Sequence, residues 1–354
     1  MSTVVRHHVS ASHLDRKRQQ APVNGVPAQV LPGVSVTVPA RLHLGFLDLN
    51  GDMGRRFGSV GLAIDGLRTR LTLRPAAQTQ IIGRERHRAA RHLATMTSYL
   101  GLTVAHHLSL DETIPAHAGL GSGTQLALAV AAAVRRLNGL ALDVPGDAMR
   151  LARGARSGIG IGLFERGGLI VDAGRGPATE IPPVVSRMPL PEDWRILVIL
   201  DPSRQGIHGE DERNAFGTLP PMAAEEAAHL CRLVLMQALP ALAERDIMRF
   251  GAAIKEMQSR LGQHFAPRQG GGAFTSAQVG AVLDLLDRGG AHGIGQSSWG
   301  PTGFAFAATQ DEAERLARIA ADHTGASGLD IRIASGLNRG AEVKTVAASN
   351  TQVP

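Results

Sequence analysis

The chain has 354 residues, of which 44% are hydrophobic, so it can bury a sizeable core and is long enough for two α/β domains. Its formal net charge is +6, but the basic residues are dispersed and aromatic residues make up only 3%, which favours a small anionic ligand over nucleic acid. The single cysteine, Cys231, excludes an internal disulfide framework and fits a cytoplasmic protein, and no apolar run approaches the ~20 residues that span a bilayer.

The N-terminal part of the chain is predicted to be a tail followed by strands. Residues 1–33 are polar and basic with scattered prolines, which predicts a disordered tail. Alternating Val, Thr, Leu and Phe residues predict a strand over 33–49, and two more strands are predicted within 58–75. A helix over 87–100 and a strand over 103–115 follow, so strands dominate this part of the chain.

A glycine-rich loop precedes the most helix-prone part of the chain. The stretch 114–134 reads IPAHAGLGSGTQLALAVAAAV, and Gly119, Gly121 and Gly123 let the main chain approach a ligand closely. A helix is predicted from Thr124 to Leu137, and its first N–H groups and positive dipole end face the loop. Such an arrangement predicts an anion site, most often for phosphate, whereas the alternative is a turn that binds nothing.

The remainder of the chain mixes helices with strands. The predicted elements are a helix near 146–154, a strand at 194–200, a helical stretch over 221–261 broken near Pro240, a helix at 310–322 and a closing strand at 329–336. The segment 156–174, RSGIGIGLFERGGLIVDAG, is predicted to be rich in turns. Early strands followed by mixed helices and strands predict an α+β fold with two domains, 34–200 and 201–348.

Several motifs resemble one known superfamily in their order and spacing. VPARLHLGFLDLNGD, IPAHAGLGSGTQ and GIGQSSWGPTGFAF are similar to motifs of the GHMP kinase superfamily, in which the middle motif is the phosphate loop. With ARSGIGIGLFERGGLIVD added, they resemble the β-ribofuranosylaminobenzene 5′-phosphate synthase branch, over about residues 33 to 346. The resemblance implies a GHMP-kinase-like fold with a ribosomal-protein-S5-like N-terminal domain and a ferredoxin-like C-terminal domain.

The resemblance also implies a reaction. Phosphoribosyl pyrophosphate would condense with 4-aminobenzoate or 4-hydroxybenzoate and release CO₂ and pyrophosphate, the first committed step toward tetrahydromethanopterin-type one-carbon carriers. The sequence does not choose between the two benzoates. The resemblance further implies a magnesium ion, Mg²⁺, that bridges pyrophosphate oxygens, and a homodimer.

The candidate site residues fall into groups by chemistry. Phosphate or substrate binding is predicted for a set of small, hydroxyl and amide residues in the glycine-rich motifs: Gly119, Gly121, Ser122, Gly123, Thr124, Gln125, Ser157, Gln296, Ser297 and Ser298. The candidates for the benzoate carboxylate or the 5′-phosphate are Arg41, His43, Arg156 and Arg204. Ser122 and Asp48 are predicted metal ligands, although Asp48 also fits a cap of the turn at NGD.

A charged loop over 201–216 follows the apolar strand predicted before it. It contains His208 and Glu210, which we predict to be catalytic together with Arg41 and His43. Two plainer interpretations stay open, namely a solvated charged loop and a buried core histidine at His43.

Two other classes of function stay open, an ATP-dependent small-molecule kinase on the same fold and a nucleic-acid-binding protein. In kinase members a carboxylate after the phosphate-loop helix activates the acceptor hydroxyl. Here Ser157 to Gly162 contains no Asp and Glu165 is the nearest acid, which argues against a kinase. Trp299 and Phe304 are predicted to pack either against an aromatic substrate or in the core.

Overall fold

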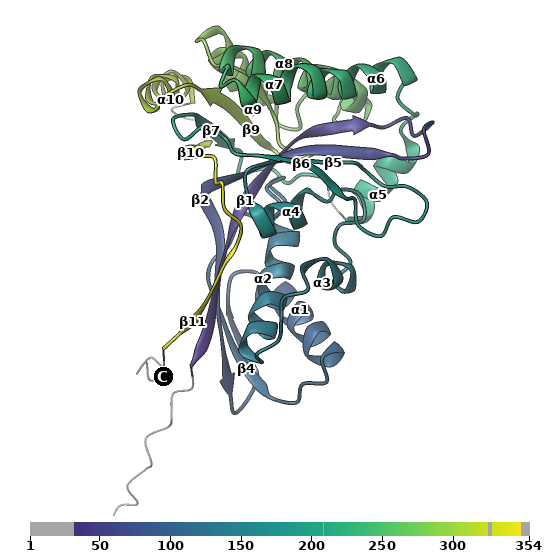
Figure 1. Cartoon of the computed structure of the whole chain (residues 1–354). Coiled ribbons are helices and arrows are strands. Elements are labelled where there is room, and N and C mark those ends of the chain that lie inside the picture. Colours follow the sequence, from purple (N-terminus) through teal and green to yellow (C-terminus); the bar gives the residue numbers. More distant parts are fainter. Residues whose placement is uncertain (1–31, 208, 325–327, 348–354) are drawn as a thin grey trace, which may run out of the picture. The chain divides into compact units, whose positions relative to one another are not determined.

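Two long antiparallel strands, β1 (Gly33–Asp48) and β2 (Phe57–Ala76), form the centre of the first sheet in the computed structural model (Figure 1). The structure describes residues 32–207, 209–324 and 328–347. The prediction of two strands within 58–75 is wrong, because β2 is continuous. The register between β1 and β2 shifts at one point, because Pro39 pairs with Arg68 whereas the next residue, Ala40, pairs with Ile64. A bulge in β2 therefore stands where a break between two strands was predicted.

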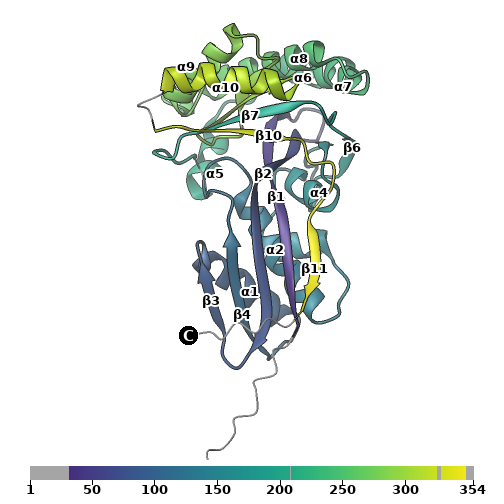
Figure 2. The ribbon, with the colours of Figure 1, turned by 90° about the vertical axis from the view of Figure 1, so that its left-hand side faces the viewer.

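The first sheet has seven strands in the order β11-β1-β2-β4-β3, with β5 paired to β2 and β6 paired to β5. The bounds of its other strands are β3 (Gln80–Gly83), β4 (Ala105–Glu112), β5 (Leu169–Asp172), β6 (Val184–Met188) and β11 (Glu342–Val346). Helices α1 (Arg86–Tyr99), α2 (Ser122–Leu137), α3 (Val144–Arg150) and α4 (Ile159–Arg166) accompany it. Figure 2 shows β11 running beside β1.

Helix α2 is the buried helix that its Ala- and Leu-rich sequence predicts. Its residues from Gln125 to Arg135 are buried, and they share a core with α1 and with strands β1, β2 and β4. The predicted helix at 87–100 and strand at 103–115 are also confirmed, with α1 and β4 ending within a few residues of the expected limits. α2 starts two residues before the predicted Thr124, at Ser122, so the glycine loop leads into it without a linker.

The prediction of turns over 156–174 is wrong, because this segment contains α4 and β5. Its glycines serve close packing. A side chain at Gly160 would meet Thr124 of α2 at 2.9 Å, and one at Gly162 would meet Ile170 of β5 at the same distance. A helix of ordinary residues could not fit between α2 and the sheet.

The second sheet has four antiparallel strands in the order β10-β7-β9-β8. Its strands are β7 (Arg195–Leu200), β8 (Ile294–Gln296), β9 (Thr302–Ala307) and β10 (Asp330–Ser335). The helices of this half are α5 (Gly209–Thr218), α6 (Ala224–Leu233), the π-helical turn η1 (Val234–Ala238), α7 (Leu239–Ala243), α8 (Ile247–Phe265), the 3₁₀ turn η2 (Ala266–Arg268), α9 (Ala277–Arg288) and α10 (Gln310–Thr324). Mainly antiparallel sheets with separate helices confirm the α+β prediction.

The long helical stretch is interrupted, but not at Pro240. That proline lies within an unbroken helical run from α6 through η1 to α7, two residues after the π-helical turn η1. The chain breaks at 244–246 instead, where Arg245 has a φ of 60°. Asp246 then caps α8 by accepting a hydrogen bond of 3.0 Å from the Arg249 N–H.

One hydrophobic core connects the two sheets. It includes Leu42 and Leu44 of β1, Ile196 and Val198 of β7, and Phe250 of α8. The alternate residues of β7 face a separate core formed with α9 and α10. Contacts place the described residues in a single unit over 31–348, so the junction between the sheets is a packed part of the molecule.

Two domain predictions are not decided by these observations. The tail predicted over 1–33 lies outside the described residues, except for its last two positions. The boundary predicted near residue 200 stays a prediction. Strand β11 belongs by sequence to the predicted second domain, 201–348, and pairs with β1 in the first sheet.

Candidate active site

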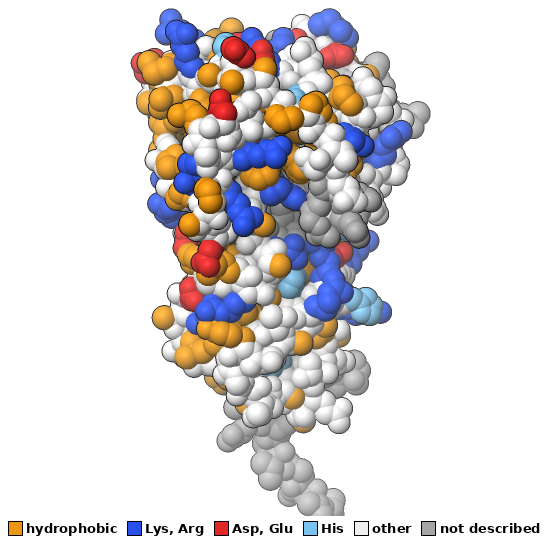
Figure 3. All heavy atoms as spheres, turned by 90° about the vertical axis from the view of Figure 1, so that its right-hand side faces the viewer, with side chains coloured by type: hydrophobic (Ala, Val, Ile, Leu, Met, Phe, Trp, Pro, Cys, Tyr) orange, Lys and Arg blue, Asp and Glu red, His pale blue; other side chains and the backbone are white. Residues whose placement is uncertain are grey.

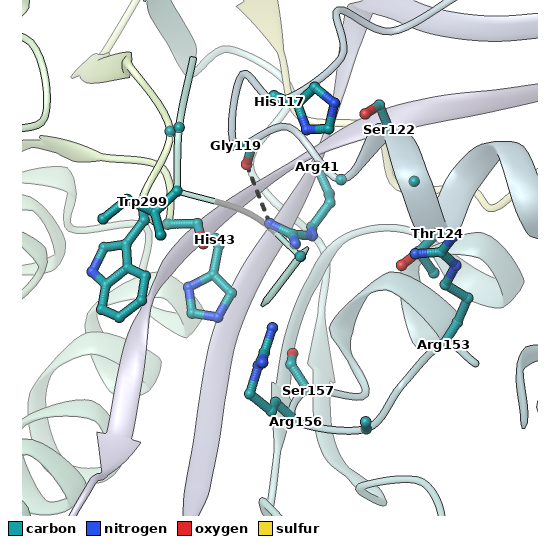
Figure 4. A pocket seen from close by; sticks show the side chains of 18 of the residues that line it. Arg41, His43, His117, Gly119, Ser122, Thr124, Arg153, Arg156, Ser157 and Trp299 are labelled. Atoms are coloured by element: carbon teal, nitrogen blue, oxygen red, sulfur yellow. Dashed lines mark hydrogen bonds between the residues drawn. The ribbon is translucent and has the colours of Figure 1, made fainter. Parts of the chain in front are cut away.

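A cavity of about 460 Å³ lies where the two sheets meet. Residues from both halves of the chain line it: the middle of β1, the glycine loop, the start of α2, the segment 152–157, Gly206, Ile207 and Gly209, and residues 298–300. In Figure 4 the side chains of Arg41, from β1, and of Arg153 and Arg156, from the segment 152–157, project toward the cavity. The site is therefore assembled by the tertiary fold rather than by one local motif.

The glycine loop has the conformation that an anion site requires. Gly119 and Gly121 have φ values of 82° and 76°, which L-residues with a Cβ rarely adopt. A Cβ at Gly119 would lie 2.2 Å from the carbonyl oxygen of Ser297. Gly121 is the N-cap of α2, and no side chain caps the helix, so the first N–H groups of α2 remain for a ligand.

A hydrogen-bond network holds the loop against β1 and the second half of the chain. The hydroxyl of Ser297 donates to the carbonyl of Gly119 (2.8 Å) and accepts from the N–H of His43 (3.0 Å). Arg41 donates from its main chain to the carbonyl of Leu120 (3.1 Å) and from its guanidinium to Gly119 (3.3 Å). These bonds fix the loop, so its N–H groups are oriented before a ligand arrives.

His43 is buried between the cavity and the core, with only 3% of its surface exposed. Burial lowers the pKa of its imidazole well below the ordinary value, and the charges of Arg41 and Arg156 lower it further. The side chain is therefore neutral at pH 7. Its Nε2 atom is buried without a hydrogen-bond partner among the described residues.

Two arginines that sequence reasoning missed converge on the start of α2. A Cβ at Gly123 would lie 2.8 Å from Nη2 of Arg88 and 3.3 Å from Nη1 of Arg153. Arg88 comes from α1 and also forms an ion pair of 2.8 Å with Glu85. Burial, followed by the charges of Arg153 and Arg88, lowers the pKa of the nearby His92 to about 4. This corner of the cavity thus has a strongly positive potential.

No Asp or Glu is among the described residues that line the cavity. The nearby carboxylate of Asp172 is buried and accepts hydrogen bonds from the Ser157 hydroxyl (3.0 Å) and the Gly158 N–H (2.9 Å). Burial raises its pKa, although these hydrogen bonds act in the opposite direction. Asp172 therefore positions the turn that carries Arg156 and Ser157. Within the described part of the chain, no cluster of three or more His, Cys, Asp or Glu side chains could hold a metal ion.

The structure brings ten of the predicted site residues into the cavity lining: Arg41, His43, Gly119, Gly121, Ser122, Gly123, Thr124, Arg156, Ser157 and Ser298. Ser297 lies directly behind them in the network described above. Gln296 lines a narrower slot that adjoins the cavity. Sequence reasoning therefore located the loop and its neighbours on β1, and missed Arg88, Arg153 and His117.

Other predicted residues lie elsewhere. Gln125 is fully buried and donates to the carbonyl of Gly160 (3.0 Å), which links α2 to α4. Asp48 accepts from the N–H groups of Asn50 and Gly51 and so closes a turn outside the cavity lining. Arg204 is exposed and is not among the lining residues.

The charged loop, 201–216, borders the cavity. His208 lies outside the described residues, and the side chain of Glu210 is likewise not described, although Glu210 belongs to α5. The flanking residues Gly206, Ile207 and Gly209 line the cavity. The proposed catalytic role of the loop stays a prediction.

The two aromatic candidates differ in their surroundings. Trp299 lines the cavity, whereas Phe304 is fully buried in β9 and packs against Phe306. Phe304 is thus a core residue.

Basic side chains also gather across the middle of the face shown in Figure 3. No helix in the described ranges is both long and apolar enough to cross a membrane.

The fold and the phosphate-loop cavity define a member of the GHMP kinase superfamily. Residues 86–163 match the model for the GHMP kinases N terminal domain, and residues 238–324 match that for GHMP kinases C terminal. A crystal structure of mevalonate diphosphate decarboxylase from Staphylococcus aureus has the same fold. It has a TM-score of 0.65 at 14% identity, covering 90% of this chain and 100% of that chain.

Curated relatives identify the branch. The β-ribofuranosylphenol 5′-phosphate synthase of Archaeoglobus fulgidus is 34% identical over 86% of this chain and 98% of its own length. The enzyme of the same name from Methanothermobacter thermautotrophicus is 31% identical over 86% and 97%. The chain belongs to the β-ribofuranosylphenol 5′-phosphate synthase family, an enzyme family. The membership predicted from the motifs is confirmed, and these relatives are named for a phenol.

Proposed function

We propose that the chain condenses phosphoribosyl pyrophosphate with a 4-substituted benzoate and releases CO₂ and pyrophosphate. Family membership supports this proposal, and the names of the relatives favour 4-hydroxybenzoate over 4-aminobenzoate. The observation that carries it is the charge of the cavity. A fixed glycine loop and four arginines line it, while no described lining residue is a carboxylate that could activate an acceptor hydroxyl.

The proposed chemistry needs electrostatics and positioning more than a strong base. The bond between the ribose C1′ and pyrophosphate breaks, and its electron pair leaves with pyrophosphate. The ring carbon that bears the carboxylate then bonds to C1′. The bond to CO₂ breaks last, and its electron pair restores the aromatic ring. A cationic, pre-oriented cavity stabilises the departing pyrophosphate, and fixed substrates supply the remaining rate acceleration.

The arginines of the cavity fall into two pairs, and we assign each pair to a different group of the substrates. Arg88 and Arg153 adjoin Gly123 at the start of α2, where the N–H groups and the helix dipole add to their charge. We assign the pyrophosphate group to this corner. Arg41 and Arg156 lie close enough to His43 to lower its pKa, and we assign them to the benzoate carboxylate.

Magnesium would have to be bound mainly by the substrate. Of the predicted ligands, Ser122 lines the cavity with Thr124, whereas Asp48 lies outside its lining. Mg²⁺ often binds through substrate phosphates and retains several waters. We therefore propose that it arrives with phosphoribosyl pyrophosphate and offsets part of the charge of that ligand, with the two hydroxyls nearby.

The cellular setting belongs to the same proposal. We place the reaction in the cytoplasm, at the entry to tetrahydromethanopterin-type carriers.

A homodimer would cover an exposed apolar patch formed by Leu235 and Met236 of η1 and Met248 of α8, each at least 64% exposed. Sedimentation of wild type and Met236→Glu would test it, since a dimer through this patch should become monomeric in the variant.

The decisive experiment combines the protein, Mg²⁺, phosphoribosyl pyrophosphate and carboxyl-labelled 4-hydroxybenzoate. We expect one labelled CO₂ and one pyrophosphate for each benzoate consumed, and none when ribose 5-phosphate replaces phosphoribosyl pyrophosphate. The same assay with 4-aminobenzoate ranks the two acceptors. Stoichiometric ADP formation from ATP and an alcohol, without CO₂ release from either benzoate, would establish a kinase instead.

A further inference from the structure

The segment 201–207, here termed the strap, leads from the end of strand β7 to the wall of the cavity. Its last two residues, Gly206 and Ile207, line the cavity. The N–H of Gly206 donates to the carbonyl of His117 (2.8 Å), and the N–H of Ile207 donates to the carbonyl of Trp299 (3.2 Å). The strap therefore bonds to two other segments that line the cavity, one in each half of the chain.

Three glycines from distant segments, Gly119, Gly206 and Gly300, meet where the strap reaches these segments. A Cβ at Gly206 would lie 2.7 Å from the Cα of Gly300 and closer still to the carbonyl oxygen of Trp299. A Cβ at Gly300 would overlap the carbonyl group of Ala118 and the Cα of Gly119. The main chains therefore pack directly against one another, and no side chain fits between them.

Asp201 fixes the start of the strap. Its buried carboxylate accepts hydrogen bonds from the N–H (3.0 Å) and the hydroxyl (2.5 Å) of Ser203, and from the hydroxyl of Ser276 (2.6 Å), which is the N-cap of α9. Burial acts to raise the pKa of this carboxyl, but the hydrogen bonds outweigh it and hold the pKa below the ordinary value. Asp201 is not among the residues that line the cavity, so it acts on the strap and not on a ligand.

The strap completes a set of hydrogen bonds to the carbonyl groups of the glycine loop. Figure 4 shows His117 and Gly119 next to each other at the edge of the cavity. The carbonyl of His117 accepts from the strap, and that of Gly119 accepts from Ser297 (2.8 Å). The carbonyl of Leu120 accepts from the main chain of Arg41 (3.1 Å). Because a peptide unit is planar, each fixed carbonyl also fixes the N–H group of the residue that follows it.

The two halves of the chain contribute different properties to the cavity. The arginines of the lining all belong to the first half: Arg41, Arg88, Arg153 and Arg156. The described lining residues of the second half are uncharged: Gly206, Ile207, Gly209, Ser298, Trp299 and Gly300. Among the described residues, the second half therefore contributes contacts and hydrogen bonds to the glycine loop rather than charge.

We infer that the strap sets the position of the glycine loop, with Gly206 and Asp201 as positioning residues for the pyrophosphate group. This inference rests on the proposed function, which assigns pyrophosphate to the start of α2. Gly206 acts through its main chain on His117 and Gly300, and Asp201 acts by holding the start of the strap. The first part of the charged loop 201–216 thus supports the anion site by its architecture.

Gly206→Ala tests the contact at the end of the strap. Gly206 has no positive φ, so alanine disturbs only the packing. The methyl group pushes the strap away from Gly300 and weakens its bond to His117. We expect calorimetry to show a Kd for pyrophosphate raised ~10-fold. The control Gly217→Ala should stay within about 2-fold of wild type, because among the described residues no atom beyond its own helix backbone and chain neighbours lies within 4 Å of a Cβ there.

Asp201→Ala tests the other end of the strap. It removes the acceptor for Ser203 and Ser276, so we expect the Kd for pyrophosphate to rise ~5-fold. Asp201→Asn keeps an oxygen that accepts from Ser203 and should restore the Kd to within about 2-fold of wild type. The matched control is Asp193→Ala, which removes an exposed carboxylate just before β7 that pairs with Arg245 (2.7 Å). Equal affinities in folded Asp201→Ala and Asp193→Ala would overturn the role of Asp201, and Gly206→Ala decides the inference if Asp201→Ala does not fold.

A purely structural role predicts a different result. It would lower the urea midpoint of Gly206→Ala and leave the Kd of the folded protein at the wild-type value, which would overturn the inference. A positioning role also predicts a split in the kinetics. The KM for phosphoribosyl pyrophosphate should rise ~10-fold in Gly206→Ala, while the KM for 4-hydroxybenzoate stays within about 2-fold of wild type.

The outcomes separate the inference from the proposed function, because calorimetry requires no turnover. A wild-type protein that binds pyrophosphate but releases no CO₂ with either benzoate would overturn the proposed function, and the Kd values of the variants would still decide the role of the strap. Wild-type Kd values in folded Gly206→Ala and Asp201→Ala would overturn the inference and leave the synthase reaction intact. A wild-type protein that binds no pyrophosphate would overturn the pyrophosphate assignment and this inference together.

Discussion

Two glycine-rich stretches of this chain, 119–123 and 158–162, look alike in sequence and both lead into a helix, but their glycines differ in conformation and in surroundings. In the first, Gly119 and Gly121 adopt positive φ values and line the cavity. In the second, Gly160 and Gly162 lie inside helix α4 and present no ligand surface. Composition alone does not distinguish a binding loop from a packing helix.

The distinction lies in what a side chain would meet. At Gly119 an added Cβ would collide with main chain, the carbonyl of Ser297, in addition to requiring an unfavourable φ. At Gly162 it would meet only side chains, those of Val184 and Ile170, at 2.8 and 2.9 Å. The loop glycines therefore serve conformation, and the helix glycines serve space. Each stretch should respond differently to one added methyl group.

The largest effect is expected for Gly119→Ala. The φ of 82° and the 2.2 Å approach to the Ser297 oxygen force the loop to move, which displaces the N–H groups. A shift of about 1 Å at a site that works by positioning reduces turnover by ~10²-fold. CO₂ release measures it, with Gly217→Ala in α5 as control, since among the described residues no atom beyond its own helix backbone and chain neighbours lies within 4 Å of a Cβ there. Turnover within 3-fold of wild type would contradict the role of the loop.

Gly162→Ala should affect stability and leave binding alone. The extra methyl group overpacks the contact between α4 and β5, which lowers the free energy of unfolding by ~2 kcal/mol. Urea unfolding measures this change, and calorimetry measures pyrophosphate affinity in the same preparation. Weaker binding at unchanged stability would place α4 in the site and remove the contrast between the two stretches.

Gly123→Ala should weaken pyrophosphate binding and leave stability nearly unchanged. Gly123 is helical, so the backbone tolerates alanine, but the methyl group would meet the guanidinium groups of Arg88 and Arg153. Displacement of these groups weakens pyrophosphate binding by ~10-fold, or ~1.4 kcal/mol. Unfolding should stay within about 0.5 kcal/mol of wild type. Equal affinities for Gly123→Ala and the control Gly217→Ala would exclude the two arginines from the pyrophosphate site.

The smallest effect is expected in the pH dependence of stability, to which His92, beside Arg88 and Arg153, contributes. Its folded pKa of about 4 lies below the ordinary 6.5, so on acidification the unfolded state takes up a proton that the folded state does not. The free energy of unfolding therefore decreases as the pH is lowered. His92 accounts for a decrease of about 1 kcal/mol between pH 6.5 and pH 5.5. His92→Gln should remove that part of the pH dependence. Saturating pyrophosphate should also reduce it, because it offsets the charges of Arg88 and Arg153, and an unchanged slope would contradict the assignment.

The sequence predicted the elements whose signal is local. The buried helix after the glycine loop and the apolar strand at 194–200 are confirmed because each satisfies its own hydrogen bonds or carries an unmistakable apolar run. Helix α4 was missed because glycine has low helix propensity, and only its packing against α2 explains the exception. Strand β11 is short and has polar residues, so its pairing with β1 left no pattern.

The candidate site shows the same division. The glycine loop and its neighbours on β1 carried recognisable motifs, and the structure brings them together. Arg88 and Arg153 reach the loop from α1 and from the segment after α3, and nothing in either local sequence marks them as neighbours. Such sites depend on tertiary contacts, which a single sequence does not encode in any short window.

Because β11 pairs with β1, the first sheet is complete only after nearly the whole chain has been synthesised. A ribosome releases β1 among the first folded residues, yet the neighbour that covers this edge of β1 is Glu342–Val346. Throughout elongation the nascent chain carries an open strand edge, which is a template for pairing with other chains. A premature stop before Glu342 would leave β1 as a permanent edge strand, so the C-terminal residues decide whether long, apolar β1 or short β11, with its charged residues, forms the edge of this sheet.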